Sequence, residues 1–269
     1  MSYFEGKVAL VTGASRGVGF AVARELCAQG ASVVISAREQ ERLTKSEREL
    51  REMGGRVIGC AGDVGNWDDA SRMVNTAVEN FGRLDIIVNN AGVSMRGDFQ
   101  RLSPDVCGQV IQTNLMGSIY VSRAGVNHLV EAQGHLIFIS SIAGIFGLPA
   151  ASIYCASKKA LSGLAESLRI ELAPHVHVGV VYLGYTEHDP EKRILLGDGS
   201  KGLPDRPAHH TQKQAASIIL RMIKQRKRWI VMTPVGILGW TFYRIAPSLL
   251  EKMVIMAKTN QWGIYKKFS

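Results

Sequence analysis

Tyr154 and Lys158 stand four residues apart, and Ser141 precedes the tyrosine by thirteen residues. On a helix, positions i and i+4 share a face, so the phenol and the ammonium can point into one site. A nearby cation favours the phenolate, which lowers the pKa of the phenol and suits it to proton transfer near neutral pH. A hydroxyl at Ser141 can hold a substrate oxygen beside it. The same spacing also occurs by chance on ordinary amphipathic helices, so the preceding elements decide its meaning.

A glycine-rich segment, T-G-A-S-R-G-V-G at 12–19, follows the apolar run K-V-A-L-V at 7–11. That run is typical of a buried parallel strand, and a helical pattern follows the glycines. Gly13 permits a tight turn, and Gly17 and Gly19 let backbone and phosphate approach closely. N–H groups at the start of the helix, helped by its dipole, bind a pyrophosphate. The order of strand, glycine turn and helix therefore predicts a nucleotide site.

Further motifs occur along the chain: Asp63-Val64, N-N-A-G at 89–92, Asn114 in T-N-L-M-G-S, S-S-I-A-G from Ser140 and Y-C-A-S-K from Tyr154. Together with the glycine turn, and in the same order, they resemble the motifs of the short-chain dehydrogenases/reductases in their common single-domain form. The resemblance covers roughly residues 5–235. One departure is Leu183-Gly184, where the family usually has Pro-Gly, and it leaves the geometry of that loop open.

The resemblance implies a doubly wound Rossmann fold and hydride transfer between a nicotinamide cofactor and a carbonyl or alcohol. Tyr154 would protonate the substrate oxygen, Ser141 would stabilise its charge, and Lys158 would lower the phenol pKa and hold the nicotinamide ribose. Asn114 would support a water chain that resupplies the proton, although by itself it reads as a structural hydrogen bond inside a helix. Ser140 is a competing hydroxyl with poorer spacing. The implied cofactor-binding residues are Gly13, Ser15, Arg16, Gly17, Val18, Gly19, Arg38, Asp63, Val64, Asn90, Ala91, Gly92, Tyr154, Lys158, Gly184 and Thr186.

The end of the second strand indicates which cofactor is used. The run S-V-V-I-S at 32–36 is followed by Ala37 and Arg38, without the acidic residue that would bind the ribose hydroxyls of NAD. Arg38 and Arg16 are placed to clamp a 2′-phosphate, which predicts NADP(H) and a carbonyl reductase. The alternatives are an exposed Arg38 without a cofactor role, an NAD-dependent alcohol or hydroxysteroid dehydrogenase, and a protein that senses NADP(H) without turnover. The intact catalytic trio argues against the sensor.

Strand-like and helical runs alternate, which predicts one α/β domain with about seven parallel strands and helices on both faces. Its 269 residues, 46% of them hydrophobic, suit a soluble globular protein, and the first apolar run, after Glu5, reads as a strand and not as a signal peptide. We expect the domain to span 1–235, with a mobile polar loop at 185–210, and 236–269 to extend it. Strands are expected near 7–11, 32–36, 56–60, 84–88, 134–139, 176–182 and 229–232, and helices near 17–29, 40–53, 67–81, 104–128, 152–172 and 211–225.

Cysteines and histidines do not suggest a metal site. The four cysteines, at 27, 60, 107 and 155, lack metal-ligand spacing and read as buried free thiols in a reducing compartment. Helix geometry turns Cys155 about 100° away from Tyr154. His188, His209 and His210 read as solvated loop residues, since the adjacent pair His209-His210 has no third ligand.

The positive charge lies at the end of the chain. Residues 1–220 hold 22 Lys+Arg and 22 Asp+Glu, whereas 221–269 hold 10 Lys+Arg and one acid, which accounts for the net charge of +9. The apolar run at 229–243 contains Pro234 and two glycines and must supply the last strand, so it is too short to span a membrane.

The segment 249–258 is expected to be a helix with apolar residues and basic flanks. It could lie in a membrane interface, cover the active site or form a subunit contact. A nucleic-acid surface is not expected, because the basic residues alternate with a hydrophobic helix. We therefore expect a cytoplasmic homo-oligomer, a dimer or tetramer, with peripheral membrane contact through 224–269 as one possibility. With the apolar tail as the far wall of its pocket, the protein would act on a hydrophobic ketone.

Overall fold

The computed structural model describes residues 2–187, 189–204 and 210–259. Its main sheet has seven parallel strands in the order β10-β7-β6-β4-β1-β2-β3, which confirms the predicted sheet. The order reverses between β1 and β4, and in sheets of this kind ligands bind at such a switch point. The strands are β1 (Val8–Thr12), β2 (Ser32–Ala37), β3 (Arg56–Ala61), β4 (Ile86–Asn89), β6 (His135–Ser141), β7 (His177–Leu183) and β10 (Trp229–Val231).

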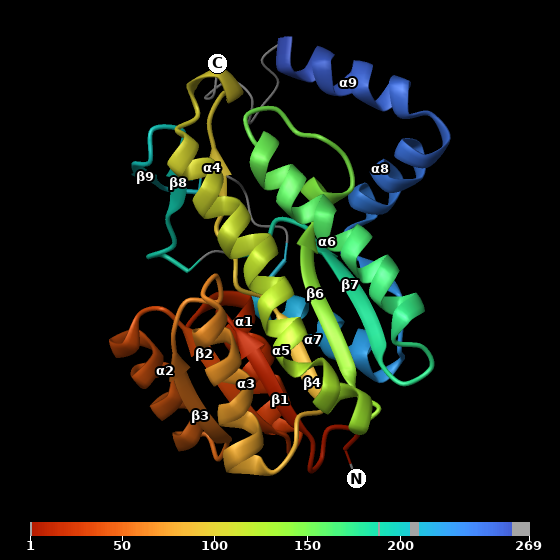
Figure 1. Cartoon of the computed structure of the whole chain (residues 1–269). Coiled ribbons are helices and arrows are strands. Elements are labelled where there is room, and N and C mark those ends of the chain that lie inside the picture. Colours follow the sequence, from red (N-terminus) through yellow and green to blue (C-terminus); the bar gives the residue numbers. More distant parts are fainter. Residues whose placement is uncertain (1, 188, 205–209, 260–269) are drawn as a thin grey trace.

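Helices cover both faces of the sheet (Figure 1). One face packs against α1 (Gly17–Ala28), α2 (Gln40–Glu52) and α7 (Gln212–Lys224). The other packs against α3 (Trp67–Phe81), α5 (Gly117–Glu131) and α6 (Ser152–Glu171). Because both faces are covered, the central strands are mostly apolar, and all five residues of β1 are buried.

The predicted helix at 104–128 is interrupted. It consists of α4 (Pro104–Ile111), a π-helical turn η2 (Gln112–Met116) and α5, and Asn114 lies inside the π turn. Such a turn is a single-residue insertion inside a longer helix, and the pattern expected for one helix at 104–128 did not reveal it. It is a feature that often marks functional sites.

The expected loop at 185–210 contains regular structure. Strands β8 (Ile194–Leu196) and β9 (Lys201–Gly202) join β5 (Met95–Arg96) in a second, three-stranded sheet. Ile194 and Leu195 are buried. Two short 3-10 turns, η1 (Phe99–Arg101) and η3 (Ile142–Gly144), complete the elements around it. His188 and His209 of this segment lie outside the described residues, so the interpretation of the histidines is not tested.

The last described residues form two helices, α8 (Pro234–Ile245) and α9 (Pro247–Thr259), which extend from one end of the molecule (Figure 1). The helix expected at 249–258 is therefore present. Within the described residues, no helix has both the length and the apolar character that crossing a membrane requires. Lys266-Lys267 lie outside the described part of the chain.

The cysteines are free thiols, as expected, but only Cys60 and Cys155 are buried, whereas Cys27 and Cys107 are partly exposed. Burial raises the pKa of the Cys155 thiol and raises that of Cys27 to about 11. These two thiols are therefore weakly reactive near neutral pH.

Two buried histidines form a neutral network at the amino ends of β6 and β7. His177 Nε2 lies 2.8 Å from the carbonyl oxygen of Lys227 and must donate to it. His177 Nδ1 then accepts from His135 Nδ1 at 3.0 Å, and His135 Nε2 accepts from the Tyr3 hydroxyl at 2.9 Å. Burial, with His177 beside it, lowers the pKa of His135 to about 3, and burial also lowers the pKa of His177.

This network predicts a loss of stability in mild acid. Because the folded-state pKa of His135 lies below the ordinary 6.5, the unfolded chain binds more protons below pH 6.5. The thermal midpoint should thus fall as the pH is lowered from 6.5 toward 3, and His135→Gln should make that decline shallower. Melting curves followed by circular dichroism across this range test it. Parallel declines in wild type and variant would contradict the assignment.

Candidate active site

The glycine turn sits against the segment after β4. Gly13 has a φ of +63°, and a Cβ on it would lie 2.7 Å from Ala91 Cα, so only glycine fits. The buried Thr12 hydroxyl accepts from the backbone N–H groups of Asn90 and Ala91, both at 3.0 Å. Asn90 Nδ2 donates to the carbonyl oxygens of Thr12 at 2.8 Å and Gly13 at 3.1 Å. The N-N-A-G motif therefore holds the turn in shape, and α1 begins directly after it at Gly17.

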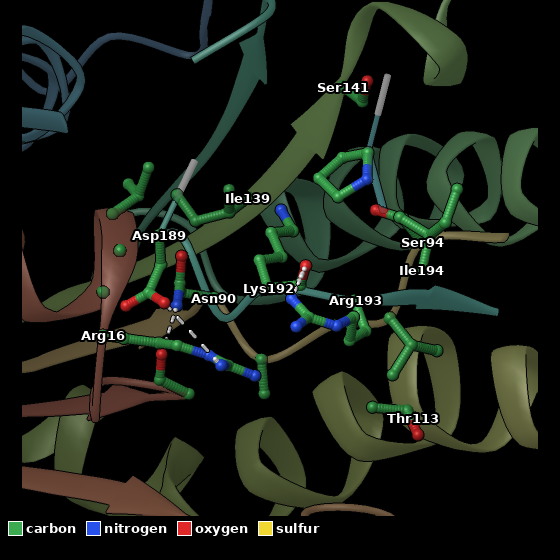
Figure 2. Close-up of a pocket in the computed structure, with 18 of the residues that line it drawn as sticks. Arg16, Asn90, Ser94, Thr113, Ile139, Ser141, Asp189, Lys192, Arg193 and Ile194 are labelled. Atoms are coloured by element: carbon green, nitrogen blue, oxygen red, sulfur yellow. Dashed lines mark hydrogen bonds and ion pairs between the residues drawn. The ribbon is translucent and has the colours of Figure 1, made fainter. Parts of the chain in front are cut away.

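A cavity of about 990 Å³ opens along the carboxyl edge of the sheet. Every candidate residue from the sequence lines it except Asn114. Figure 2 shows Arg16 and Asp189 facing each other in one part of this cavity, with Ser141 and Ser94 in another. The cavity therefore joins the glycine turn to the predicted catalytic trio.

Tyr154 lies at the catalytic end of the cavity. Burial raises the pKa of its phenol, while a hydrogen bond with Ser141, the positive charge of Arg96 and a hydrogen bond with Ser94 act in the opposite direction. Ser141 Oγ also accepts from the backbone N–H of Ala143 at 3.2 Å, which fixes its position at the end of β6. The phenol and the Ser141 hydroxyl are thus paired, as the spacing predicted.

The surroundings of Lys158 and Tyr154 differ from the expectation of a lowered phenol pKa. Its Nζ donates to the carbonyl oxygen of Ile139 at 2.9 Å. Burial, helped by the charge of Lys192, lowers the pKa of Lys158 to about 8. The expected net lowering of the Tyr154 pKa is wrong for this structure, because desolvation of the phenol outweighs the hydrogen bonds and the charge of Arg96 that lower it.

Asn114 contacts the catalytic site through the backbone. Its Oδ1 accepts from the Val93 N–H at 2.7 Å, and its Nδ2 donates to the Val93 carbonyl oxygen at 3.0 Å and to Ser157 Oγ at 3.1 Å. A Cβ on Gly92 would lie 3.1 Å from Asn114 Oδ1 and 3.3 Å from Lys158 Nζ, so the two groups flank one point. Asn114 fixes the loop after β4 beside the lysine, and a role in a water chain stays a prediction.

The neighbouring residues Ser140, Gly184 and Thr186 make contacts that hold the local structure in place. Ser140 Oγ donates to the Lys158 carbonyl oxygen at 2.9 Å, which leaves Ser141 as the hydroxyl that pairs with the phenol. A Cβ on Gly184 would lie 2.4 Å from Thr233 Cγ2, so the Leu183-Gly184 variant of the loop keeps its glycine for steric reasons. Thr186 Oγ1 donates back to Gly184 at 3.2 Å.

At the other end of the cavity, arginines meet carboxylates. Arg38 lies 3.9 Å from Asp63, whose Oδ1 caps the Gly65 N–H at 2.9 Å. Arg16 lies 4.0 Å from Asp189, and Arg42 of α2 lies 3.9 Å from Asp189 and pairs with Glu191. Three guanidinium groups therefore line this end, and two of them pair with carboxylates of the segment after β7.

Four lining residues were not predicted from the sequence. Arg96 reaches Tyr154 from β5, a strand that the sequence did not reveal, and Ser94 reaches it from the position just before β5. Arg42 reaches the cavity from the first turn of α2. Lys192 also lines the cavity. Burial and the charge of Arg16 lower the pKa of its ammonium, and the charge of Asp189 partly opposes this shift. Arg42 had a usable signal, since it stands in the first turn of the helix predicted at 40–53, shortly after Arg38 and the second strand.

The family model described as short chain dehydrogenase matches residues 7–196, so the chain belongs to the short-chain dehydrogenase/reductase family. The 11-beta-hydroxysteroid dehydrogenase 1A of Arabidopsis thaliana is 38% identical over 197 residues, which cover 72% of this chain and 56% of that protein. The chain thus spans little more than half the length of this curated relative.

Two solved structures are similar. A short-chain dehydrogenase/reductase from Burkholderia phymatum in complex with NAD has a TM-score of 0.82 at 24% identity and covers 93% of this chain and 96% of its own; it shows the fold. A metagenomic short-chain oxidoreductase in complex with NADP is 31% identical, with a TM-score of 0.71, and covers 84% of this chain and 96% of its own. One of these two structures thus contains NAD and the other NADP.

Gly19→Ala is predicted to disrupt the glycine turn. The added Cβ would lie 2.4 Å from Asn90 Nδ2 and 2.5 Å from the Gly13 carbonyl oxygen, the groups that hold the turn together. Overpacking of about 1–3 kcal/mol should weaken nicotinamide nucleotide binding about tenfold or more in fluorescence titrations. The control is Gly163→Ala on α6, where the Cβ meets open space and should add about 0.5–1 kcal/mol of stability. Unchanged nucleotide binding by Gly19→Ala would contradict the role of the turn.

Proposed function

We propose that the protein is an NADPH-dependent reductase that converts a hydrophobic ketone to an alcohol. The observation that carries this proposal is the partly buried Tyr154, hydrogen-bonded to Ser141, in the cavity that also holds Lys158 and the glycine turn. The family's chemistry and the type of side chain found at each position agree with it.

The residues at the arginine end fit a dinucleotide that carries a 2′-phosphate. The cradle at Gly13 and Gly19 has no room for a Cβ, and α1 presents its free N–H groups beside it. The second strand ends in Ser36, Ala37 and Arg38 and offers no carboxylate to a ribose hydroxyl. This supports NADP(H) over NAD(H).

The chain's own part in the reaction is to hold the substrate oxygen and to give it a proton. When bound, NADPH supplies the hydride. Ser141 and Tyr154 bond to each other, so a carbonyl oxygen set between them can accept from both hydroxyls. Because burial keeps the Tyr154 phenol protonated at neutral pH, it is ready to donate as negative charge develops on that oxygen. The cations Arg96 and Lys158 then stabilise the phenolate.

The walls near Tyr154 support a hydrophobic substrate. Apolar side chains line this part of the cavity: Val93, Met95, Ile142, Leu148, Ile194 and Leu195. Tyr154 itself packs against the clusters to which Met95, Leu195 and Leu148 belong. The named activity of the Arabidopsis relative, a hydroxysteroid dehydrogenase, points to the same chemical class.

Steady-state turnover with NADPH and NADH, across aliphatic, steroid and small polar ketones, tests this proposal. We expect turnover with NADPH and a preference for the apolar ketones. Reduction of small polar ketones alone would overturn the substrate class. Faster alcohol oxidation with NAD would favour the dehydrogenase alternative, and tight NADPH binding without turnover would favour a sensor.

We expect the rate of ketone reduction to depend on whether the side chain of Lys158 is protonated. Values of kcat/KM report groups of the free protein, in which the pKa of Lys158 is about 8, whereas that of Tyr154 lies above its usual 10. We therefore expect kcat/KM for NADPH-dependent reduction to fall as pH rises through about 8. Lys158→Arg, whose guanidinium stays charged, should remove this decline even if its rate is low. A decline of the same position in Lys158→Arg would contradict the assignment.

We also propose that the chain forms a dimer or tetramer, as its family membership suggests. Ile170 of α6 is 82% exposed, which leaves an apolar side chain on one of the long helices. Sedimentation velocity tests this: a monomer at micromolar concentration would contradict it.

A further inference from the structure

Helix α8 is anchored to the body along one face. A Cβ on Gly239 would lie 2.8 Å from the Phe146 ring, and Tyr243 Oη accepts from Lys159 Nζ of α6 at 2.5 Å. The Trp240 ring lies 4.4 Å from the Trp229 ring, centroid to centroid. Gly236, Gly239, Trp240 and Tyr243 stand at positions i, i+3, i+4 and i+7, so they form one side of the helix.

The opposite side of α8 is apolar and exposed. Val235 is 78% exposed, Leu238 59%, Phe242 38% and Ile245 79%, and they also stand three or four residues apart. A helix with apolar residues on both sides is expected to be covered on both sides. In the chain described, the second side of α8 faces solvent.

Helix α9 continues this surface. It contacts α8 and contains no buried residue. Leu249, Met253 and Met256, all about half exposed, form one stripe at four- and three-residue steps. Together, the exposed apolar residues of α8 and α9 form what we call the α8–α9 face: Val235, Leu238, Phe242, Ile245, Leu249, Met253 and Met256.

The α8–α9 face does not belong to the active-site cavity. No residue of the described segment 229–259 lines that cavity, so the expectation that the tail forms its far wall is wrong for this part of the chain. Thr233, the N-cap of α8, nevertheless lies against Gly184 at the carboxyl edge of the sheet. The face therefore stands next to the site without closing it, and something outside the described chain must cover it.

The charge of α8 and α9 indicates what kind of partner covers the α8–α9 face. The two helices carry three basic residues, Arg244, Lys252 and Lys258, against one acid, Glu251, whereas the basic residues at 221–228 lie at the opposite, amino edge of the sheet. Arg244 stacks on Trp240 at 4.8 Å, and Lys252 and Lys258 stand exposed on α9. A two-fold contact with a second copy would bring like charges together, whereas an anionic surface would neutralise them.

We propose that the α8–α9 face docks on an anionic lipid bilayer, with its apolar side chains in the interface and its lysines and arginines at the headgroups. Apolar burial and attraction to anionic lipid add in such helices, and each basic residue near the surface contributes about a factor of five in affinity. This would make the protein a peripheral membrane protein, with its catalytic edge beside the bilayer.

Cosedimentation of the full chain with phosphatidylcholine vesicles, with and without phosphatidylserine, tests the proposal. We expect binding to the vesicles that contain phosphatidylserine, weakened by salt and at least about tenfold weaker with phosphatidylcholine alone. Leu238→Asp/Phe242→Asp should reduce binding at least about tenfold, and Lys252→Gln/Lys258→Gln should reduce it about twentyfold. Phe99→Asp, which removes a 71% exposed aromatic residue from η1, is the matched control and should bind like wild type.

Two outcomes would overturn the proposal. One is equal binding by wild type and both double variants, each first shown to melt like wild type. The other is a wild-type dimer that fails to bind vesicles and that Leu238→Asp/Phe242→Asp converts to a monomer, because the α8–α9 face would then be covered by a second copy. Sedimentation velocity on the same samples distinguishes the two.

Discussion

Tyr154→Phe should lower kcat/KM for ketone reduction by about three orders of magnitude, within the range that general acid catalysis contributes. The phenyl ring keeps the packing of Tyr154 against its apolar neighbours and removes only the hydroxyl that meets Ser141. NADPH binding should survive, because the glycine turn and the arginines lie in another part of the cavity. Single-turnover reduction with a steroid ketone, together with NADPH titration, measures both quantities.

Tyr182→Phe is the matched control for this result. It removes the phenol of a buried tyrosine outside the cavity, whose hydroxyl bonds to Ser162 at 2.8 Å. It should cost about 1 kcal/mol of stability and leave turnover near wild type. An equal loss of activity in both variants would mean that the tyrosines act through the fold, and retained activity in Tyr154→Phe would remove the general acid from the mechanism.

The pairing of Tyr154 with Ser141 was predictable because it depends on local geometry. A four-residue step on a helix and a hydroxyl at a strand end follow from the sequence once the strands and helices are recognised, and the seven strands were recognised by their apolar runs. The glycine turn was predictable for the same reason. It requires particular residues at fixed positions between a strand and a helix.

The electrostatic environment of the site was not predictable in this way. Whether Lys158 lowers the phenol pKa depends on how deeply both groups are buried and on the Ile139 carbonyl that receives the ammonium. Arg96 approaches Tyr154 from the two-residue strand β5, and Ser94 from the position just before it, and so short a strand produces no periodic pattern. The carboxylates of Asp189 and Glu191 reach the arginines only through the path of the segment after β7. These contacts depend on tertiary structure and leave no mark in local sequence.

Arg38→Ala/Arg42→Ala should weaken NADPH binding about a hundredfold or more and leave NADH binding almost unchanged. A hydrogen bond to a charged group contributes about 1.5–3 kcal/mol, so losing two guanidinium partners of a 2′-phosphate removes at least two factors of ten. NADH lacks that phosphate. Arg48→Ala, which removes an exposed cation from the same helix, is the control for general charge. Titration of both cofactors at two salt concentrations measures the difference.

Removing the carboxylates opposite these arginines should have the opposite effect and strengthen NADPH binding. Asp189 and Glu191 pair with Arg16 and Arg42 and therefore compete with a phosphate for the same guanidinium groups. Asp189→Asn/Glu191→Gln should tighten NADPH binding, by no more than about fivefold because partly exposed ion pairs contribute little, and the gain should shrink at high salt. NADH should respond less. Equal effects of the arginine and carboxylate variants on both cofactors would mean that these residues shape the cavity without reading the 2′-phosphate, and the case for NADP(H) would then depend on Arg16 alone.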